Sequence, residues 1–270
     1  MLLVLACYFL VPAVWLLINS TKDTAQIQGT FGFMIALPLH FSENLVALFT
    51  YQDAAFWEWL RNSLIYSTAV ALGTVIVSAM GGYAFAVYEF RGKQPAFYII
   101  LGAIMIPSTA LVLPIFFMAS SVGLVNTYWG VILPSIANPF ALYLMRVFWE
   151  TSLPRELIEA ARLDGAREFR AFAWIGLPTV MPGLATVALT AFVGTWNNFF
   201  LPLVMLTDDR LYPLTLGLSV WNSTAAAQSA REPLYGMILV GSIISMIPLL
   251  LVFGLMRRYW ISGLTAGATK

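Results

Sequence analysis

Charged residues are scarce in this sequence of 270 residues, where Asp, Glu, Lys and Arg together make up 10%. An average soluble protein contains about 25% charged residues. Hydrophobic residues reach 60%, and the 14 Lys and Arg nearly balance the 13 Asp and Glu. This balance provides no strong field for nucleic acid or for a cationic partner. The composition argues against a soluble enzyme and predicts a membrane protein.

The sequence contains a single cysteine, Cys7, and a single histidine, His40. One cysteine excludes an internal disulfide, and the two residues together are too few for the usual zinc sites. A phosphate-binding loop is also missing, because Gly92-Lys93 is followed by Gln94 and lacks the upstream glycine. No Ser/His/Asp or Cys/His set can be assembled. We therefore expect a chain that is not an enzyme, with no catalytic residue, metal site or resident cofactor.

Six apolar segments approach or exceed the length of about 20 residues that a helix needs to cross a bilayer. None of them contains Asp, Glu, Lys, Arg or His. Because unpaired backbone groups are costly in lipid, such segments must be helical. The predicted fold is therefore all-α, a single transmembrane domain over residues 1–270. Its six predicted transmembrane helices lie at 1–18, 63–88, 97–119, 128–145, 180–206 and 234–256.

The positive charges predict the orientation of these spans. With six spans, both termini share one side of the membrane with the loops at 89–96 and 146–179. That side carries 10 of the 14 Lys and Arg residues, and the opposite side carries more acidic than basic residues. We therefore predict that both termini are cytoplasmic.

The predicted spans contain no Asp, Glu, Lys, Arg or His. Because ionisable residues in a membrane mark proton relays, their absence argues against a proton-coupled pump. Another chain must then supply the energy for any uphill movement. Prolines within the spans predict kinks, since each removes a backbone hydrogen bond. Among these prolines are Pro107, Pro114, Pro134, Pro139, Pro182, Pro202 and Pro248.

The loop at 146–179 differs from the rest of the chain, because it holds five basic and five acidic residues. Ser152-Leu153-Pro154 predicts a helix start, with Glu156 in the first turn, and Gly165 predicts a left-handed end. Such a helix is too charged to enter the membrane. It either docks on a protein partner or rests on lipid headgroups. The predicted apolar stripe of this helix comprises Leu157, Ala160 and Ala161. A second predicted stripe comprises Phe169, Phe172 and Ala173 and continues toward Ile175. Leu177-Pro178 closes the segment.

A longer motif runs through the same loop. Glu159-Ala160-Ala161, Gly165, Ile175 and Leu177-Pro178 reproduce E-A-A-x3-G-x9-I-x-L-P. This pattern resembles the signature loop of membrane subunits of bacterial ABC importers. Within these the chain is similar to the MalG-type permease of maltose-type carbohydrate importers. Supporting matches are Asp164-Gly165-Ala166, Phe172, Asn62-Ser63-Leu64, Gly123-Leu124, Asn126-Thr127, Trp196-Asn197 and the tail from Ser262 to Ala268, so that the resemblance covers about 62–270.

The resemblance implies that the segment from Glu159 to Gly165 is a coupling helix, which lies between the fourth and fifth spans and docks in a groove of an ATPase subunit. Glu159 would pair with a basic side chain of that subunit. From the residues alone, Glu159 could equally be a surface charge beside Arg155 or Arg162. The ATPase-coupling residues implied are Glu159, Ala160, Ala161, Asp164, Gly165, Ile175, Leu177 and Pro178, with an ATPase-contacting tail at Thr265, Gly267 and Ala268.

The fifth predicted span contains a candidate substrate path at Thr195, Trp196, Asn197 and Asn198. Aromatic faces and amides suit a sugar, although such side chains can also bridge helices structurally. Asn198 stands where the related subunits often carry an acid, which disfavours a cationic ligand. In the maltose-type importers, the other membrane subunit holds most of the sugar.

Taken together, the resemblance implies a permease subunit of an ATP-driven, binding-protein-dependent importer of a sugar or sugar derivative. The implied partners are a MalF-type permease, two ATPase subunits that carry ATP and magnesium, an extracytoplasmic substrate-binding protein and membrane lipid. The location is the cytoplasmic membrane of a bacterium or archaeon. The alternatives are an ABC permease for a polyamine or phosphonate and a membrane scaffold without transport activity.

Overall fold

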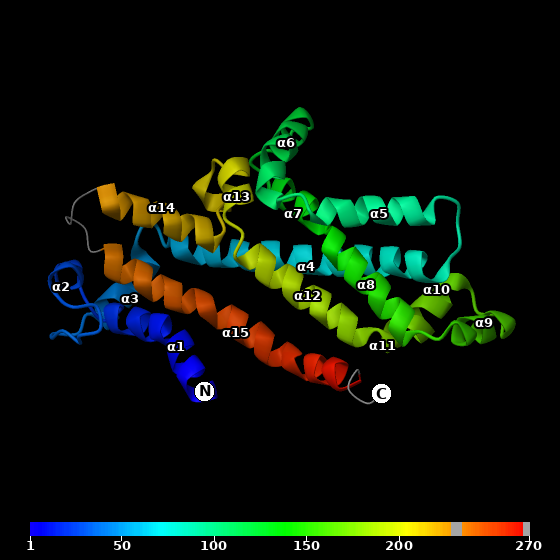
Figure 1. Cartoon of the computed structure of the whole chain (residues 1–270). Helices are drawn as coiled ribbons and strands as arrows, with labels where there is room; N and C mark the ends of the chain where they lie inside the picture. The colour runs from blue at the N-terminus through cyan, green and yellow to red at the C-terminus, as the bar shows by residue number, and fades with distance from the viewer. Residues whose placement is uncertain (228–233, 267–270) are drawn as a thin grey trace. The chain divides into compact units, whose positions relative to one another are not determined.

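The computed structural model describes residues 1–227 and 234–266, and no strand occurs in those two ranges. Figure 1 shows the helices with their labels. In chain order the elements are α1 (Leu2–Asn19), α2 (Thr24–Gly29), α3 (Phe41–Thr50), α4 (Ala55–Val87), α5 (Lys93–Ile104), α6 (Ser108–Ser121), α7 (Tyr128–Ile136), α8 (Pro139–Ser152), α9 (Arg155–Leu163), α10 (Glu168–Arg170), the π-helical turn η1 (Ala171–Gly176), α11 (Leu177–Thr179), α12 (Met181–Trp196), α13 (Phe200–Met205), the 3₁₀ turn η2 (Asp209–Leu211), α14 (Leu214–Ala227) and α15 (Leu234–Ala266).

The chain forms two compact units. The first comprises Met1–Leu64 and Leu206–Leu251, and the second comprises Ile65–Met205 and Val252–Lys270. The long helices α4 and α15 each contribute to both units. The second unit contains the predicted loop at 146–179 and the candidate substrate path, so that both candidate functional regions belong to one packed body.

Two predicted spans are confirmed as single helices that are long and apolar enough to cross a membrane. They are α4, over 33 residues, and the first 24 residues of α15. Against the predicted bounds of 63–88 and 234–256, α4 begins earlier, at Ala55, and ends at Val87, whereas α15 continues to Ala266. Within the described ranges there are two such helices, or up to five if each bent pair counts as one span. The apolar part of α1, Val4–Asn19, is shorter than these helices.

The predicted continuous helices at 97–119 and 128–145 are wrong, because each is divided in two. The chain bends by 106° between α5 and α6 and by 40° between α7 and α8. Figure 1 shows α6 turned away from the direction of α5. Pro107 precedes α6 and has no N–H to continue the helix. At the second break, Asn138 accepts a hydrogen bond from the backbone N–H of Ala141 (3.0 Å), which caps α8.

The predicted helix at 180–206 is also divided, since α12 ends at Trp196 and α13 begins at Phe200. The amide of Asn197 donates to the carbonyl of Val193 (2.9 Å). The side-chain oxygen of Asn198 accepts from the N–H of Leu201 (3.4 Å). Asparagine side chains that bind nearby backbone groups compete with helical hydrogen bonds, which explains why the helix stops at this pair.

In the first unit, the start of α4 is tied to the segment before α14. The Asn62 amide donates to the carbonyls of Arg210 (2.7 Å) and Tyr212 (3.1 Å). The hydroxyl oxygen of Ser63 accepts from the N–H of Leu214 (2.7 Å). These side chains therefore satisfy backbone groups of a loop about 150 residues away along the chain.

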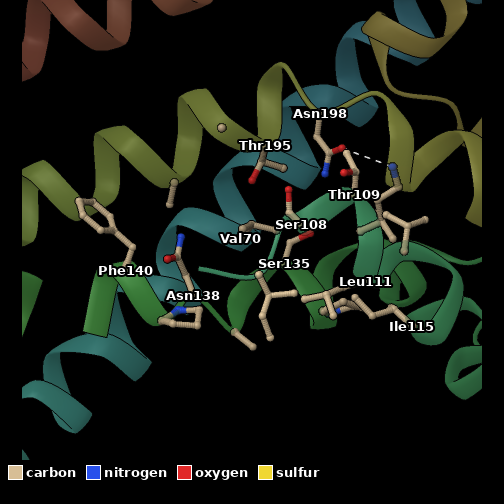
Figure 2. A pocket seen from close by; sticks show the side chains of 18 of the residues that line it. Val70, Ser108, Thr109, Leu111, Ile115, Ser135, Asn138, Phe140, Thr195 and Asn198 are labelled. Carbon is tan, nitrogen blue, oxygen red and sulfur yellow. Dashed lines mark hydrogen bonds between the residues drawn. The ribbon is translucent and has the colours of Figure 1, made fainter. Parts of the chain in front are cut away.

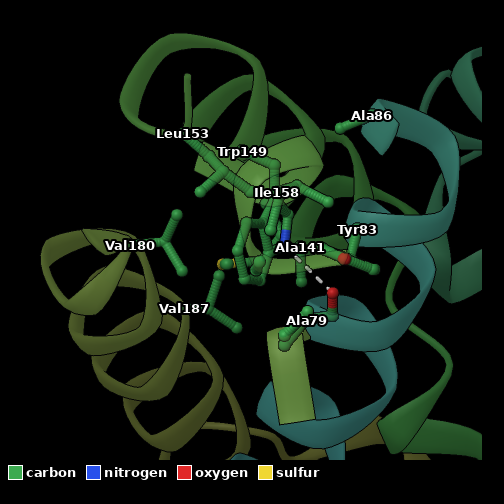
Figure 3. Close-up of a cluster of buried hydrophobic side chains, with 12 residues drawn as sticks. Ala79, Tyr83, Ala86, Ala141, Trp149, Leu153, Ile158, Val180 and Val187 are labelled. Atoms are coloured by element: carbon green, nitrogen blue, oxygen red, sulfur yellow. Dashed lines mark hydrogen bonds between the residues drawn. The ribbon is translucent and has the colours of Figure 1, made fainter. Parts of the chain in front are cut away.

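The core of the second unit surrounds Trp149 of α8 (Figure 3). Its ring packs edge-on against Tyr83 of α4, and its indole N–H donates to the carbonyl of Ala79 (3.0 Å). Gly82 lets α4 and α8 approach closely, because a Cβ there would lie 2.7 Å from the backbone nitrogen of Arg146. The two helices thereby form a close-packed pair at the centre of this unit.

Candidate functional site

The predicted helix in the loop at 146–179 is confirmed as α9. It begins after Pro154 and carries Glu156 in its first turn. It ends where Gly165 adopts a left-handed conformation with φ of 81°. The N–H of Ala166 then donates to the carbonyl of Ala161 (2.9 Å), which satisfies a carbonyl at the end of the helix.

The predicted apolar stripe of α9 is only partly buried. Ile158 and Ala161 are buried in the core around Trp149, with Ile158 2% exposed. Leu157 is 41% exposed and Ala160 is exposed, so that of the predicted stripe only Ala161 packs against the core. Two adjacent faces of this short helix are apolar. The sequence pattern does not indicate which of the two packs against the rest of the chain. The result is an anchored inner face and an open outer face.

A cluster of hydrogen bonds, here called the clamp, joins Arg162, Glu168 and Tyr88. The guanidinium of Arg162 donates twice to the carboxylate of Glu168, at 2.8 and 3.1 Å, and the Tyr88 hydroxyl donates to the same carboxylate at 2.8 Å. These bonds, that from Arg162 above all, hold the pKa of Glu168 below its ordinary value. The clamp therefore links α9, α10 and the end of α4.

The clamp is not among the contacts expected from the sequence. Arg162 was an expected partner of Glu159, whereas the structure pairs Arg162 with Glu168. The two partners are six residues apart, beyond the separation that places two side chains on one helix face, and the turn at Gly165 brings them together. No spacing in the sequence indicates that pairing.

Glu159 lies exposed on α9 and forms no ion pair with any side chain that the structure describes. It lines a small cavity of about 260 Å³ together with Trp149, Glu150 and Arg162. Asp164 and Gly165 are exposed at the end of the helix. The polar end of α9 is thus open to a partner, while the helix itself is held by its buried face.

The second half of the loop is helical from Glu168 to Thr179, although it includes the π-helical turn η1. The N–H of Leu177 donates to the carbonyl of Phe172, five residues earlier. Pro178 has no N–H and follows directly, and the chain bends by 81° before α12. Ile175 and Leu177 are half-buried against the core. The segment thus ends at Thr179, one residue after the predicted Leu177-Pro178.

The predicted tail falls largely outside the described residues. Thr265 lies in the last turn of α15, and its side chain is not described. Gly267 and Ala268 lie beyond residue 266, where the described chain ends.

The candidate substrate path is only partly brought together. Thr195 and Asn198 line a cavity of about 500 Å³ in the second unit (Figure 2). Trp196 is buried and stacks on Phe192, and Asn197 is exposed, bound to its own helix. Neither of these two residues lines the cavity. Two of the four predicted residues therefore share one site.

The other walls of this cavity were missed as site residues. Ser108 and Thr109 come from the start of α6, Ser135 comes from the last turn of α7, and Asn138 comes from the break before α8 (Figure 2). The sequence did signal the breaks through Pro107 and Pro139, but only as kinks. None of the residues that line the cavity is Asp, Glu, Lys, Arg or His.

Among the residues that the structure describes, no three His, Cys, Asp or Glu side chains gather as a metal site would require. The single cysteine, Cys7, is exposed on α1.

Comparison with known families matches residues 78–260 to the family described as "Binding-protein-dependent transport system inner membrane component". The match contains the whole of α9, the clamp residues and every residue that lines the larger cavity except Val70.

Several curated proteins are similar over most of the chain. The arabinooligosaccharides transport system permease protein AraQ of Halalkalibacterium halodurans is 37% identical over 84% of this chain and 79% of its own length. The trehalose/maltose transport system permease protein MalG of Thermococcus litoralis is 31% identical over 100% of this chain and 94% of its own. The diacetylchitobiose uptake system permease protein NgcG of Streptomyces coelicolor is 31% identical over 97% of this chain and 84% of its own.

The fold is similar to that of a solved chain from a bacterial ABC transporter involved in the import of the acidic polysaccharide alginate. The TM-score is 0.81 with 23% sequence identity, over 96% of this chain and 93% of the other. At this identity the likeness concerns the fold alone.

Proposed function

Because this chain belongs to the family of binding-protein-dependent transport system inner membrane components, we propose that it serves an ATP-driven importer of a sugar or sugar derivative. Membership of the family confirms the resemblance predicted from the loop motif. The chain is a permease subunit of the inner membrane and not an enzyme. Such a subunit works with a partner permease, an ATPase and a substrate-binding protein.

The relatives support a sugar as the transported solute. Their names refer to arabinooligosaccharides, diacetylchitobiose, lactose and trehalose or maltose. The alternatives of a polyamine or a phosphonate have no such support among the relatives reported above. The scaffold alternative leaves both the motif of α9 and the cavity without a role.

We further propose six spans with cytoplasmic termini. The apolar α1, the long α4 and α15, and the three segments that include bent pairs supply six crossings. The predominance of Lys and Arg in the loops at 89–96 and 146–179 supports the orientation.

The partner permease is of the MalF type. Two ATPase subunits carry ATP and magnesium on the cytoplasmic side, and the tail at Thr265, Gly267 and Ala268 contacts them.

The observation that carries the coupling proposal is the division of α9 into a buried and an open face. The outer face, with Leu157, Ala160 and Leu163, is free to dock in a groove of the ATPase, and Glu159 pairs there with a basic side chain. The inner face and the clamp fasten the helix to α4 and α8. A displacement of α9 by the ATPase is therefore passed to the spans.

Transport then follows as a population shift. ATP-driven closure of the ATPase subunits favours one conformation of the spans, and a loaded binding protein outside favours the same one. Each input can shift the equilibrium only by its differential affinity for the two states. No step requires a charged residue inside the spans, in agreement with their composition.

The test is uptake by the complex reconstituted in proteoliposomes, with the ATPase, the partner permease and the binding protein present. We expect Glu159→Ala to reduce ATP-dependent sugar uptake about tenfold or more, because an ionic contact at the docking surface is lost. Glu156→Ala is the matched control, since Glu156 is also exposed, in the first turn of α9. Unchanged uptake and ATP hydrolysis in Glu159→Ala would contradict the coupling role.

A further inference from the structure

We propose that the cavity of about 500 Å³ in the second unit is a binding site for an uncharged, hydroxyl-rich solute of saccharide chemistry. The inference rests on the proposed function and adds a solute site on this chain. That site includes Thr195 and Asn198 of the predicted path but not Trp196 or Asn197, and it involves segments far from α12 in the sequence.

The cavity lies where three divided helices meet. Its lining includes Ile106 and Ser108 at the break between α5 and α6, Ala137 and Asn138 between α7 and α8, and Asn198 between α12 and α13. The ends of a helix leave backbone N–H and C=O groups without helical partners. Inside a membrane such groups are tolerated only where they are buried in protein or face a polar cavity. Three breaks around one cavity therefore concentrate hydrogen-bonding capacity at this place.

Side-chain hydroxyls add to this capacity. Ser108, Thr109 and Thr195 contribute hydroxyls to the cavity, and none of the three forms a hydrogen bond within the described chain (Figure 2). By contrast, the hydroxyl of Ser135 donates to the carbonyl of Val131 (2.7 Å), and Asn138 caps α8. The first three hydroxyls are thus available to a ligand, and each can both donate and accept.

The lack of charge around the cavity selects the ligand class. A charged ligand in the cavity would find no opposite charge, because no ionisable residue lines it. A polyamine or a phosphonate would remain unpaired there. Phe140 and Phe200 supply apolar ring surface for the C–H faces of a sugar, and the volume lies within the range of about 300–1,000 Å³ that is usual for ligand sites.

The experiment uses cysteine protection in the full complex. Cys7 is replaced by alanine, and Thr195→Cys is labelled with N-ethylmaleimide in the presence and absence of arabinotriose, trehalose, lactose, diacetylchitobiose or spermidine. Uptake of each compound by the same complex is measured in parallel. We expect a saccharide that is taken up to slow the labelling of Thr195→Cys several-fold. Spermidine should have no effect.

Two controls guard the result. Thr186→Cys, on the same helix but outside the cavity, should label at one rate with or without saccharide. Ser108→Cys provides a second reporter if Thr195→Cys does not assemble. In the same complex with Cys7 retained, Thr195→Val should raise the KM for uptake about three- to tenfold, the effect of losing one hydrogen bond, whereas Thr186→Val should not.

The outcomes separate the site from the proposed function. If a saccharide is taken up but protects neither Thr195→Cys nor Ser108→Cys, the site is wrong and the sugar importer stands. If spermidine is taken up and no saccharide is, the proposed function and the site both fail. Protection by a saccharide at both reporters, with none at Thr186→Cys, supports the site.

Discussion

The two functional regions of the second unit are built in opposite ways. Around α9, several polar groups are committed: Arg162, Glu168 and Tyr88 bind one another, and the indole of Trp149 binds a backbone carbonyl, although the buried hydroxyl of Tyr83 has no partner in the described chain. Around the larger cavity, hydroxyls such as that of Thr195 are left without partners in the described chain. A region that transmits movement needs fixed contacts, whereas a region that receives a solute needs unused ones.

The largest expected effect is a loss of stability at Trp149, in the core of the region around α9. Trp149 is 1% exposed, and Trp149→Ala should reduce the free energy of unfolding by about 3–5 kcal/mol, because it leaves a cavity and removes the hydrogen bond from the indole to the carbonyl of Ala79. Thermal denaturation of the purified complex in detergent measures this loss. Trp174→Ala is the control, since Trp174 is 78% exposed. Equal losses for both variants would show that the packing around Trp149 does not hold this region.

An intermediate effect on stability is expected in the cavity wall, where some polar side chains form hydrogen bonds within the chain and others do not. Asn138→Ala should cost about 1 kcal/mol of stability, because the side chain caps α8 through the N–H of Ala141. Ser108→Ala should change stability by less than about 0.5 kcal/mol, since that hydroxyl has no partner within the described chain. The same denaturation assay distinguishes the two. A larger loss for Ser108→Ala would contradict the distinction between committed and available groups.

The smallest effect on stability concerns the clamp, whose charges are exposed to solvent. Glu168→Gln should cost less than about 1 kcal/mol, although we expect it to lower the sugar imported per ATP hydrolysed, because α9 is held less firmly. The pKa of Glu168 is lowered by Arg162 and Tyr88, so its contribution is complete above the ordinary value of 4.5 and is lost as the pH falls through the lowered value.

The pH dependence provides the measurement for the clamp. Between pH 7 and pH 3, the melting temperature of the wild type should fall more than that of Glu168→Gln, and the two curves should converge at the acidic end. Glu156→Gln serves as the control, because Glu156 lies in the first turn of α9 and is not part of the clamp. Parallel curves for wild type and Glu168→Gln would contradict the proposed contribution.

Much of the architecture could be predicted from local patterns. The long apolar runs of α4 and α15, the start of α9 at Pro154 and its end at Gly165 each depend on residues close together in the sequence. The prolines also predicted irregular helices. A missing N–H indicates where a helix is weakened, but the angle of 106° at Pro107 depends on how the separated pieces pack.

The parts that could not be predicted depend on contacts between distant segments. Ile158 rather than Leu157 is buried because α9 meets Trp149 from one side, and both residues are apolar. The pairing of Arg162 with Glu168 requires the turn at Gly165. The cavity requires three segments to converge, so Ser108 and Thr195 have no relation in sequence spacing that would mark them as neighbours.

The π-helical turn η1 has a consequence for the phase of the helix that contains it. A residue in an α-helix is rotated by about 100° from its neighbour, and a π turn accommodates one residue more than the α-helical turn it replaces. Side chains before η1, such as Phe169, are therefore out of phase with those after it, such as Leu177. Removing one residue from η1 would turn one side of this segment away from the core, although all the remaining residues were unchanged.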